Sequence, residues 1–221
     1  MMNVKLIGFS PDPEKIPAMA AKLTHSKTKP EELGKSSEKE LQTILEQVMK
    51  LGHTSVVEHT SFTFAISDVS RSLTHQLVRH RIASYAQQSQ RYVNLNDPHY
   101  VIPPTIEKDT QMKKAYEKTM ILIWDQYNKL LTLGIPAEDS RYVLPNATCT
   151  NIIVTMNARS LLNFFELRCC LHAQWEIRRL AQKMLQEVKK IAPYIFKNAG
   201  PPCKTKKICP ENKPDCPLYP K

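Results

Sequence analysis

The scarcity and wide spacing of glycine constrain this sequence more than any other feature. Among its 221 residues there are only five glycines, namely Gly8, Gly34, Gly52, Gly134 and Gly200. A Rossmann-type turn or a phosphate-binding loop needs several glycines close together, because the backbone must bend sharply and approach the phosphates. Neither motif can form here. Any dinucleotide that the chain binds must therefore be held by side chains.

Residues 79–92 contain side chains suited to that task. The segment combines three arginines and a histidine with serines and glutamines. Arginine presents a rigid, permanently charged fork that matches two phosphate or carboxylate oxygens at once. We therefore expect this segment to bind an anion, and an exposed basic loop without a ligand is the alternative that charge alone allows.

Length and charge narrow the class of protein. A chain of 221 residues can bury the core of one full domain, and its net charge of +10 favours an anionic partner. The longest apolar run, residues 120–124, is too short to span a bilayer, and residues 1–11 lack the apolar stretch of a secretory signal. With six cysteines and no export signal, we expect reduced thiols, a cytoplasmic location and no membrane partner.

Hydrophobic periodicity predicts a chain of the α/β (α+β) class, in which a mixed sheet is flanked by long helices. Alternating side chains predict strands at residues 4–9, 61–67 and 148–156. Apolar stripes of helical spacing predict helices at residues 13–23, 37–51, 71–78, 105–133, 159–169 and 174–191. Ser37 and Glu40 have the spacing of a capping box at the start of one of these helices.

The composition changes after residue 197. Residues 1–197 are predicted to form one folded domain, and residues 198–221, which contain six prolines and five lysines, a tail outside the fold. The tail also carries Cys203, Cys209 and Cys216, whose spacing does not match the usual pairs of zinc ligands. We assign no metal, although three thiolates completed by another ligand stay an open alternative.

Three segments, in order, resemble the flavin-dependent thymidylate synthase (ThyX) family. They are residues 52–59, residues 79–92 with their Arg-His-Arg, serine and Arg-Tyr pattern, and residues 157–176. Together they cover the chain from about residue 52 to 177. The sequence departs from the family's frequent Thr, Asn and Glu at three positions, which are Ser55, Ala86 and Gln87.

This resemblance implies the fold of that family and a specific reaction. The enzyme would convert deoxyuridine monophosphate (dUMP) to thymidine monophosphate (dTMP), with 5,10-methylenetetrahydrofolate supplying the carbon and NADPH reducing a bound FAD. Family members are homotetramers with sites between subunits, so the chain itself is an expected partner, beside dUMP and folate. Nucleic acid is not an expected partner.

The resemblance also implies the residues of two sites. The dUMP site would be lined by Gln76, Arg79, Gln87, Gln88, Ser89, Gln90, Arg91, Arg141 and Arg168. FAD would be held by His53, Ser55, Arg79, His80, Arg81, Gln87, Asn157, Arg159 and Asn163. The catalytic candidates are Arg168, Ser89 and His53. A guanidinium at Arg168 beside the uracil ring would favour loss of the N3 proton, because it stabilises the developing anion.

The residues alone leave other interpretations open. A lone histidine such as His53 is more often structural, and Arg159 and Arg168 would each fit an ordinary surface or intrahelical pair. His80 lies between two arginines, so we expect it to be neutral. Ser89 has no evident partner base, so we expect it to donate a hydrogen bond and not to act as a nucleophile.

Two other classes of protein also fit part of the pattern. One is a flavoprotein oxidoreductase that acts on another substrate. The other is a basic nucleic-acid-binding protein, which the net charge and the lysines of the tail would suit. The lysines are scattered, however, and residues 79–92 contain too few aromatic side chains to stack bases.

Overall fold

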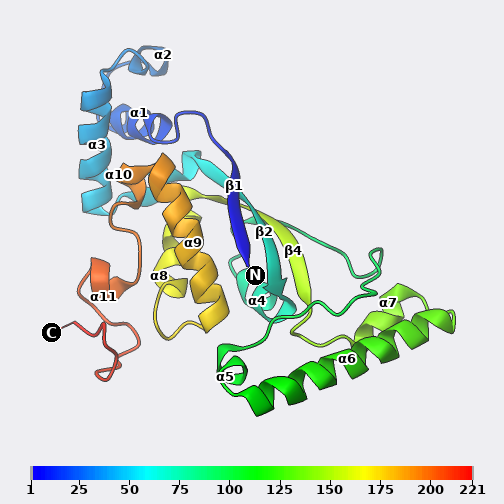
Figure 1. Cartoon of the computed structure of the whole chain (residues 1–221). Helices are drawn as coiled ribbons and strands as arrows, with labels where there is room; N and C mark the ends of the chain where they lie inside the picture. The colour runs from blue at the N-terminus through cyan, green and yellow to red at the C-terminus, as the bar shows by residue number, and fades with distance from the viewer. Residues whose placement is uncertain (1, 221) are drawn as a thin grey trace. The chain divides into compact units, whose positions relative to one another are not determined.

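A computed structural model describes residues 2–220 and divides them into two compact units (Figure 1). The first unit consists of residues 66–79 and 86–153 with the described start of the chain. The second consists of residues 4–65 and 80–85 with everything described from residue 154 onward. None of the described helices is both long and apolar enough to cross a membrane.

One four-stranded sheet contributes strands to both units. In the order in which they pair, its strands are β1 (Asn3–Phe9), β2 (Ser61–Ser70), β4 (Cys149–Asn157) and β3 (Ser84–Gln87). The Thr63 and Thr155 hydroxyls lie 2.9 Å apart, and the Asp68 N–H lies 3.4 Å from the Asn151 side-chain oxygen. Residue numbers that increase along β2 therefore face residue numbers that decrease along β4, so these two strands are antiparallel. The α+β class is confirmed, with an antiparallel sheet where a mixed one was expected.

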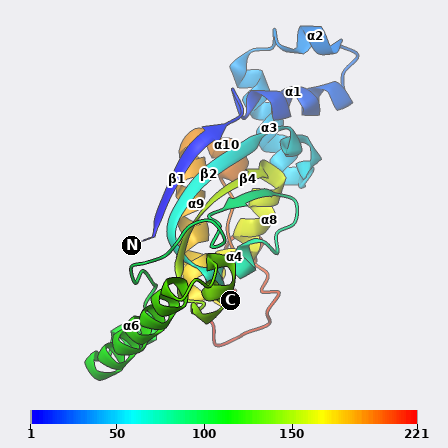
Figure 2. The same ribbon diagram turned by 90° about the vertical axis from the view of Figure 1, so that its right-hand side faces the viewer.

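The second unit packs helices on one face of its strands. Its helices are α1 (Lys15–Thr24), α2 (Pro30–Leu33), α3 (Glu38–Leu51), η1 (Thr54–His59), α8 (Ala158–Arg168), α9 (Trp175–Ile191), α10 (Pro193–Phe196) and α11 (Pro202–Thr205). Figure 2 shows α8 and α9 behind the strands of this unit. The alternation predicted for β2 is confirmed, because Phe62 and Phe64 are fully buried. Phe196 of α10 packs edge-on against Phe62 and Phe165 at 5.5 and 5.9 Å.

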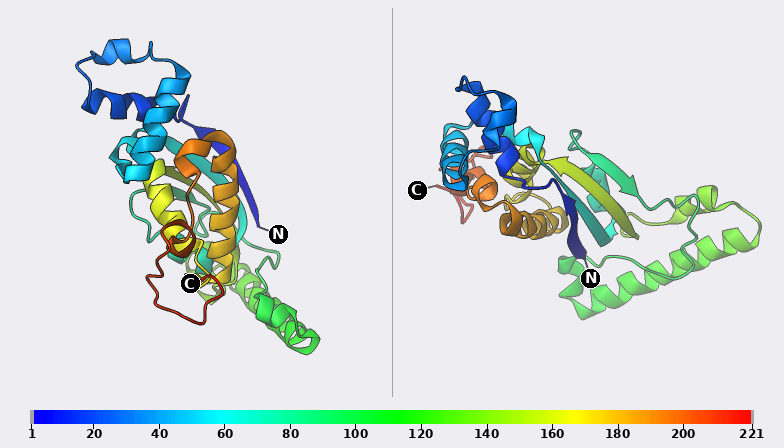
Figure 3. Two further views of the ribbon diagram at one scale, coloured as in Figure 1. Left: turned by 90° about the vertical axis from the view of Figure 1, so that its left-hand side faces the viewer. Right: turned by 90° about the horizontal axis from the view of Figure 1, so that it is seen from above.

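Helix α3 begins and ends where its sequence predicts. The Ser37 hydroxyl accepts the N–H of Glu40 at 3.3 Å, which stabilises a helix start by about 1 kcal/mol. The reciprocal half of the predicted capping box is replaced, because the Glu40 carboxylate pairs with Lys22 at 2.6 Å. Gly52 ends the helix with φ of 77°, which is strained for residues with a Cβ. Figure 3 shows α10 in orange beside α3 in light blue.

The first unit is dominated by one long helix. Its helices are α4 (Arg71–Leu77), α5 (Pro104–Glu107), α6 (Thr110–Thr132), α7 (Ala137–Ser140) and η2 (Arg141–Val143). The single helix predicted over residues 105–133 is interrupted before α6. Asp109 is extended there, and its carboxylate accepts the N–H groups of Gln111 and Met112 at 2.8 and 3.0 Å. An aspartate that accepts these backbone N–H groups favours a new helix start over continuation of the preceding helix.

Strand β3 lies inside residues 79–92, for which periodicity predicts no strand. It is polar and lacks an apolar face, so periodicity gives no sign of it. Its pairing with β4 continues just past its end, where the Gln88 N–H donates to the Asn151 carbonyl at 2.9 Å. The segment is thereby held to the sheet by its backbone.

The residues after position 197 belong to the second unit. Gly200, Pro201 and Pro202 are buried, and α11 follows directly. The division into a catalytic domain of residues 1–197 and a tail of residues 198–221 stays a prediction.

Candidate active site

Two arginines of the first unit contact Glu138, and a third lies within electrostatic reach of one of them. The Arg91 Nε lies 2.7 Å from the Glu138 carboxylate, and the Arg141 Nε donates to the Glu138 carbonyl at 2.9 Å. Burial lowers the pKa of Arg71, and the positive charge of Arg141 lowers it further, so these two guanidinium groups lie within electrostatic reach. We call Arg71, Arg91, Arg141 and Glu138 the arginine cluster. Its positive charges outnumber its negative charge, which suits a bound anion.

Two glutamines of the predicted dUMP set are fixed against β4 and α4. The Gln87 amide donates to the hydroxyls of Thr74 and Thr150 at 3.2 and 3.3 Å. The Gln88 side-chain oxygen accepts from the Asn151 amide at 3.0 Å. These contacts hold the chain in a defined path just before Ser89.

Ser89 shapes the turn that leads to Arg91. Its hydroxyl oxygen accepts the N–H of Arg91 at 3.1 Å, and its carbonyl accepts the N–H of Val93 at 3.1 Å. Because that hydroxyl accepts a bond here, its own proton can be donated to a ligand. The Arg91 guanidinium also lies 5.3 Å above the Tyr92 ring.

The remaining predicted dUMP residues are divided between the units. Gln76 is half-buried in α4, and its carbonyl accepts the N–H of Arg79, which is exposed. The first unit therefore contains Gln76, Arg79, Gln87, Gln88, Ser89, Gln90, Arg91 and Arg141, while Arg168 belongs to the second. Sequence reasoning missed Arg71 and Glu138. For Glu138, the available signal was its spacing of three residues from Arg141 in the sequence.

In the second unit, Arg168 at the end of α8 meets His80. The Arg168 Nε donates to the His80 Nε2 at 3.1 Å. The Phe164 ring packs edge-on against the His80 ring at 4.9 Å, and the Tyr85 hydroxyl donates to the His80 carbonyl at 2.8 Å. Residues 88 positions apart are thus brought into direct contact by the fold.

His80 is neutral in this setting. Burial, followed by the charge of Arg168, lowers its pKa to about 4. Because the Arg168 Nε can only donate, His80 Nε2 must accept, which places the remaining ring proton on Nδ1. The predicted neutrality is therefore supported, but its cause is different, since burial and Arg168 replace the two arginines that flank His80 in sequence.

The polar face of α8 lines a cavity of about 600 Å³ in the second unit. Arg159, Asn163 and Glu166 follow one another at spacings of four and three residues, so they share one face. The opposite face is apolar and buried through Ala158, Leu161, Phe164 and Phe165. The cavity volume lies within the range of about 300–1,000 Å³ that small-molecule and cofactor sites occupy. At its edge, Arg159 forms an ion pair with Glu58 of η1.

The other predicted FAD residues lie outside this cavity lining. The Asn157 side chain accepts the N–H of Ser160 at 2.8 Å and caps α8. His53 and Ser55 are exposed on either side of Thr54, which does line the cavity. Arg81 is exposed. Arg159 and Asn163 therefore lie together in the cavity lining, and His80 contacts Arg168 elsewhere in the second unit. Arg79 and Gln87 belong to the first unit.

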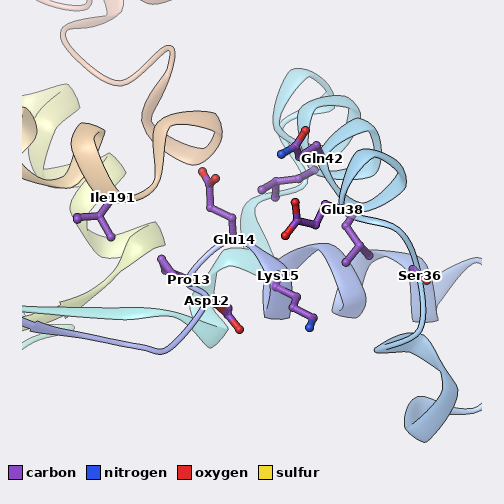
Figure 4. A pocket seen from close by; sticks show the side chains of 10 residues that line it. Asp12, Pro13, Glu14, Lys15, Ser36, Glu38, Gln42 and Ile191 are labelled. Carbon is purple, nitrogen blue, oxygen red and sulfur yellow. The ribbon is translucent and has the colours of Figure 1, made fainter.

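A second cavity of about 280 Å³ has a structural role (Figure 4). It is lined by Asp12, Glu14 and Glu38 among others and contains no predicted site residue. The Glu14 carboxylate accepts the N–H groups of Tyr194 and Ile195 at 2.7 and 3.0 Å, which caps α10. Burial raises the pKa of Glu14 although these two bonds lower it.

The tail cysteines do not assemble a metal site in the structure. Over residues 2–220, no group of three or more His, Cys, Asp or Glu side chains is placed to hold a metal ion. Cys203, Cys209 and Cys216 are each free thiols.

Comparison with known proteins identifies the family. Residues 5–194 match the Thy1 family, described as "Thymidylate synthase complementing protein". The flavin-dependent thymidylate synthase of Clostridium tetani is 49% identical over 97% of this chain and 93% of its own length. That of Geobacter sulfurreducens is 49% identical over 97% of this chain and 94% of its own length.

A solved structure shows the same fold. It is the crystal structure of a UMP/dUMP methylase PolB from Streptomyces cacaoi bound with 5-Br dUMP, with a TM-score of 0.78. The alignment covers 89% of this chain and 93% of that one, at 23% sequence identity. With both comparisons in agreement, the chain belongs to the Thy1 family and is a flavin-dependent thymidylate synthase, a methyltransferase whose cofactor is FAD.

Proposed function

We propose that this enzyme methylates dUMP to dTMP with 5,10-methylenetetrahydrofolate as the carbon donor and NADPH as the reductant. Family membership supports the reaction class, and the arginine cluster supports a nucleotide monophosphate as the substrate. The single observation that carries the assignment is the excess of positive charge around Glu138 in the first unit. A phosphate that bears two negative charges would balance that excess.

The arginine cluster is proposed to bind the 5′-phosphate of dUMP. Arg91 and Arg141 already converge on one carboxylate and its backbone, so their guanidinium groups point at a common region. Each charge-assisted hydrogen bond to a phosphate would contribute roughly 1.5–3 kcal/mol. The nucleotide would also contact the neighbouring polar side chains Gln76, Arg79, Gln87, Gln88, Ser89 and Gln90.

Arg168 is proposed to act on the uracil ring. Its Nε donates to His80, while the guanidinium carries further N–H groups in the same plane. A fixed positive charge beside the ring favours loss of the N3 proton, and the resulting anion increases the electron density at C5. C5 can then attack the one-carbon unit as the bond from that carbon to a folate nitrogen breaks and leaves its electron pair on the nitrogen, so no covalent bond to the enzyme is needed.

The cavity beside α8 fits an anionic cofactor of the size of a nucleotide. Arg159 and Asn163 offer charged and amide donors on one wall, and Lys50 adds a second positive charge. We propose that Arg159 and Asn163 hold FAD there, with His53, Ser55, Arg79, His80, Arg81, Gln87 and Asn157 as further contacts. When bound, FAD transfers reducing equivalents from NADPH to the one-carbon unit.

A homotetramer and a cytoplasmic location complete the proposal. Strand β1 lies at an edge of the sheet, and its Ile7 and Phe9 remain 49% and 47% exposed. Exposed apolar side chains on an edge strand are typical of surfaces that pair with another chain. Light scattering on the purified protein would measure the mass, and a monomer at micromolar concentration would contradict the assembly.

The decisive experiment follows NADPH oxidation and the visible spectrum of the purified protein, with and without dUMP. We expect a yellow protein that forms dTMP only when dUMP and methylenetetrahydrofolate are both present. NADPH oxidation that does not respond to dUMP would instead indicate a flavoprotein with another substrate. A colourless protein with salt-sensitive DNA binding would indicate the nucleic-acid-binding alternative.

A further inference from the structure

The segment of residues 198–206, which we call the strap, lies beyond the part of the chain that the Thy1 family profile matches. It nevertheless forms one wall of the cavity beside α8. Asn198, Ala199, Gly200, Thr205 and Lys206 line this cavity together with Arg159 and Asn163. The strap is therefore part of the cavity and not a free extension.

One end of the strap is firmly anchored. Gly200, Pro201 and Pro202 are buried, and the Ala199 N–H donates to the Phe196 carbonyl at 3.1 Å. Gly200 has φ of 145°, a conformation that residues with a Cβ rarely adopt. The Lys206 N–H donates back to the Pro202 carbonyl at 2.8 Å, which closes α11 and fixes the backbone of Lys206.

At the other end of the strap, the Lys206 side chain forms an ion pair. The Lys206 Nζ lies 2.9 Å from both carboxylate oxygens of Glu166. The two side chains remain 57% and 35% exposed, so the pair contributes little to stability. Glu166 is three residues from Asn163 and seven from Arg159 on the same helical face. The ammonium group can thus exchange its carboxylate for a ligand anion in the same cavity at small cost.

We propose that the strap completes the FAD pocket and that Lys206 is a further FAD-binding residue, which contacts the diphosphate. This inference rests on the proposed assignment of the cavity to FAD. The diphosphate is the charged part of FAD, and Arg159 and Lys206 present positive charge to the cavity from α8 and from the strap. Lys206 would leave Glu166 and bind the cofactor when FAD enters.

A binding experiment on FAD-stripped, full-length protein tests this role without measuring turnover. FAD is titrated into wild type, Lys206→Gln and Lys204→Gln, and flavin fluorescence reports the Kd. Lys204 is exposed on α11, does not line the cavity and undergoes the same change in charge. We expect Lys206→Gln to raise the Kd about 10- to 100-fold, as expected for one lost charge-assisted bond, and Lys204→Gln to change it less than about 2-fold. Equal Kd values for the two variants would overturn the proposal.

A Glu166→Gln variant separates binding from a structural role of the ion pair. If the pair only held the strap in place, removing either partner would weaken FAD binding equally. If Lys206 binds FAD, Glu166→Gln frees the ammonium group, and the Kd should stay the same or fall by up to about 3-fold. Weakening by Glu166→Gln to the same extent as by Lys206→Gln would count against the proposal.

Gly200→Ala tests the strap as a whole. The substitution strains the backbone at φ of 145°, whereas Gly34→Ala, at φ of −63° with open space around the Cβ, is a matched control. Gly200→Ala should release FAD at least about 3-fold faster than Gly34→Ala, with unchanged circular dichroism. The same release rate in both variants would exclude a role of the strap in retaining FAD.

An Arg159→Ala variant distinguishes failure of this inference from failure of the underlying assignment. If Arg159→Ala binds FAD as tightly as wild type, the cavity is not the FAD site, and both proposals fall. If Arg159→Ala loses FAD and Lys206→Gln does not, only the strap inference is wrong.

Discussion

The charged groups of the two units differ in how they are paired. In the first unit, Arg91 pairs with the carboxylate of Glu138, Arg141 donates to the carbonyl of the same residue, and Arg71 lies within electrostatic reach of Arg141. In the second unit the positive groups have individual partners, in the pairs Arg159–Glu58, Arg168–His80 and Lys206–Glu166. The first arrangement needs an external anion to balance it. The second can admit a large ligand by exchanging partners one at a time.

The largest expected effect comes from Arg168. Arg168→Ala should lower kcat about 100- to 1,000-fold, because one positioned donor to a developing anion typically contributes this much. The protein should stay yellow, since Arg168 does not line the cavity beside α8. Stopped-flow absorbance and dTMP formation measure both properties. Arg178→Ala, which removes an arginine that donates to the carbonyls of Leu171 and Ala173, is the control. Turnover equal to that of the control would remove Arg168 from the mechanism.

Loss of the cofactor is the next largest effect. Arg159→Ala or Asn163→Ala should raise the Kd for FAD about 10- to 100-fold and yield a nearly colourless preparation, because each removes donors that face the cavity. The absorbance of the purified protein near 450 nm reports the bound flavin. If both variants retained FAD fully, the proposed difference between the two units would be wrong, because the cavity beside α8 would then have no assigned ligand.

The arginine cluster should respond in opposite directions to two substitutions. Arg141→Ala should raise the KM for dUMP about 10-fold, because a charge-assisted bond to the phosphate is lost. Glu138→Gln should lower that KM or leave it unchanged, because it removes the negative charge that competes with the phosphate. The flavin spectrum should be unaffected in both. A rise in KM for both substitutions would mean that the cluster is structural.

The smallest effect is a pH dependence of stability from His80. Its pKa in the folded chain is about 4, below the ordinary value of 6.5, so the unfolded chain binds more protons between these values. Stability should therefore be greatest above pH 6.5 and fall as the pH decreases towards 4, by about 1–2 kcal/mol after allowance for solvent screening. Urea unfolding at pH 7 and pH 5 would measure it.

A His80→Gln variant is the control for that measurement. It should show a shallower loss of stability over the same pH range, because the titrating group is gone. An identical pH dependence in wild type and variant would show that His80 does not titrate abnormally.

Most elements of the fold could be predicted from local patterns. The alternation around Phe62 and the apolar stripe of α9 both arise because one face of the element is buried. Burial of one face appears in the sequence as hydrophobic periodicity. The break at Asp109 and strand β3 could not be predicted in the same way. One depends on a side chain that competes with the backbone, and the other on backbone pairing with β4.

The sites were less predictable than the fold. The charge of residues 79–92 indicates an anion site, but the sequence does not show that Arg71 and Glu138 join Arg91 and Arg141. Contact between His80 and Arg168 depends on the path of the chain between them. The pairing of Lys206 with Glu166 is likewise non-local, so no local pattern in the sequence predicts it.

The Glu14 carboxylate that caps α10 connects the N-terminal and C-terminal parts of the chain. Tyr194 and Ile195, whose N–H groups it accepts, also line the cavity beside α8. Glu14, near the N-terminus, therefore stabilises a cavity wall that residues close to the C-terminus form. Glu14→Ala, which removes only the capping carboxylate, should therefore loosen this wall and let the cofactor escape.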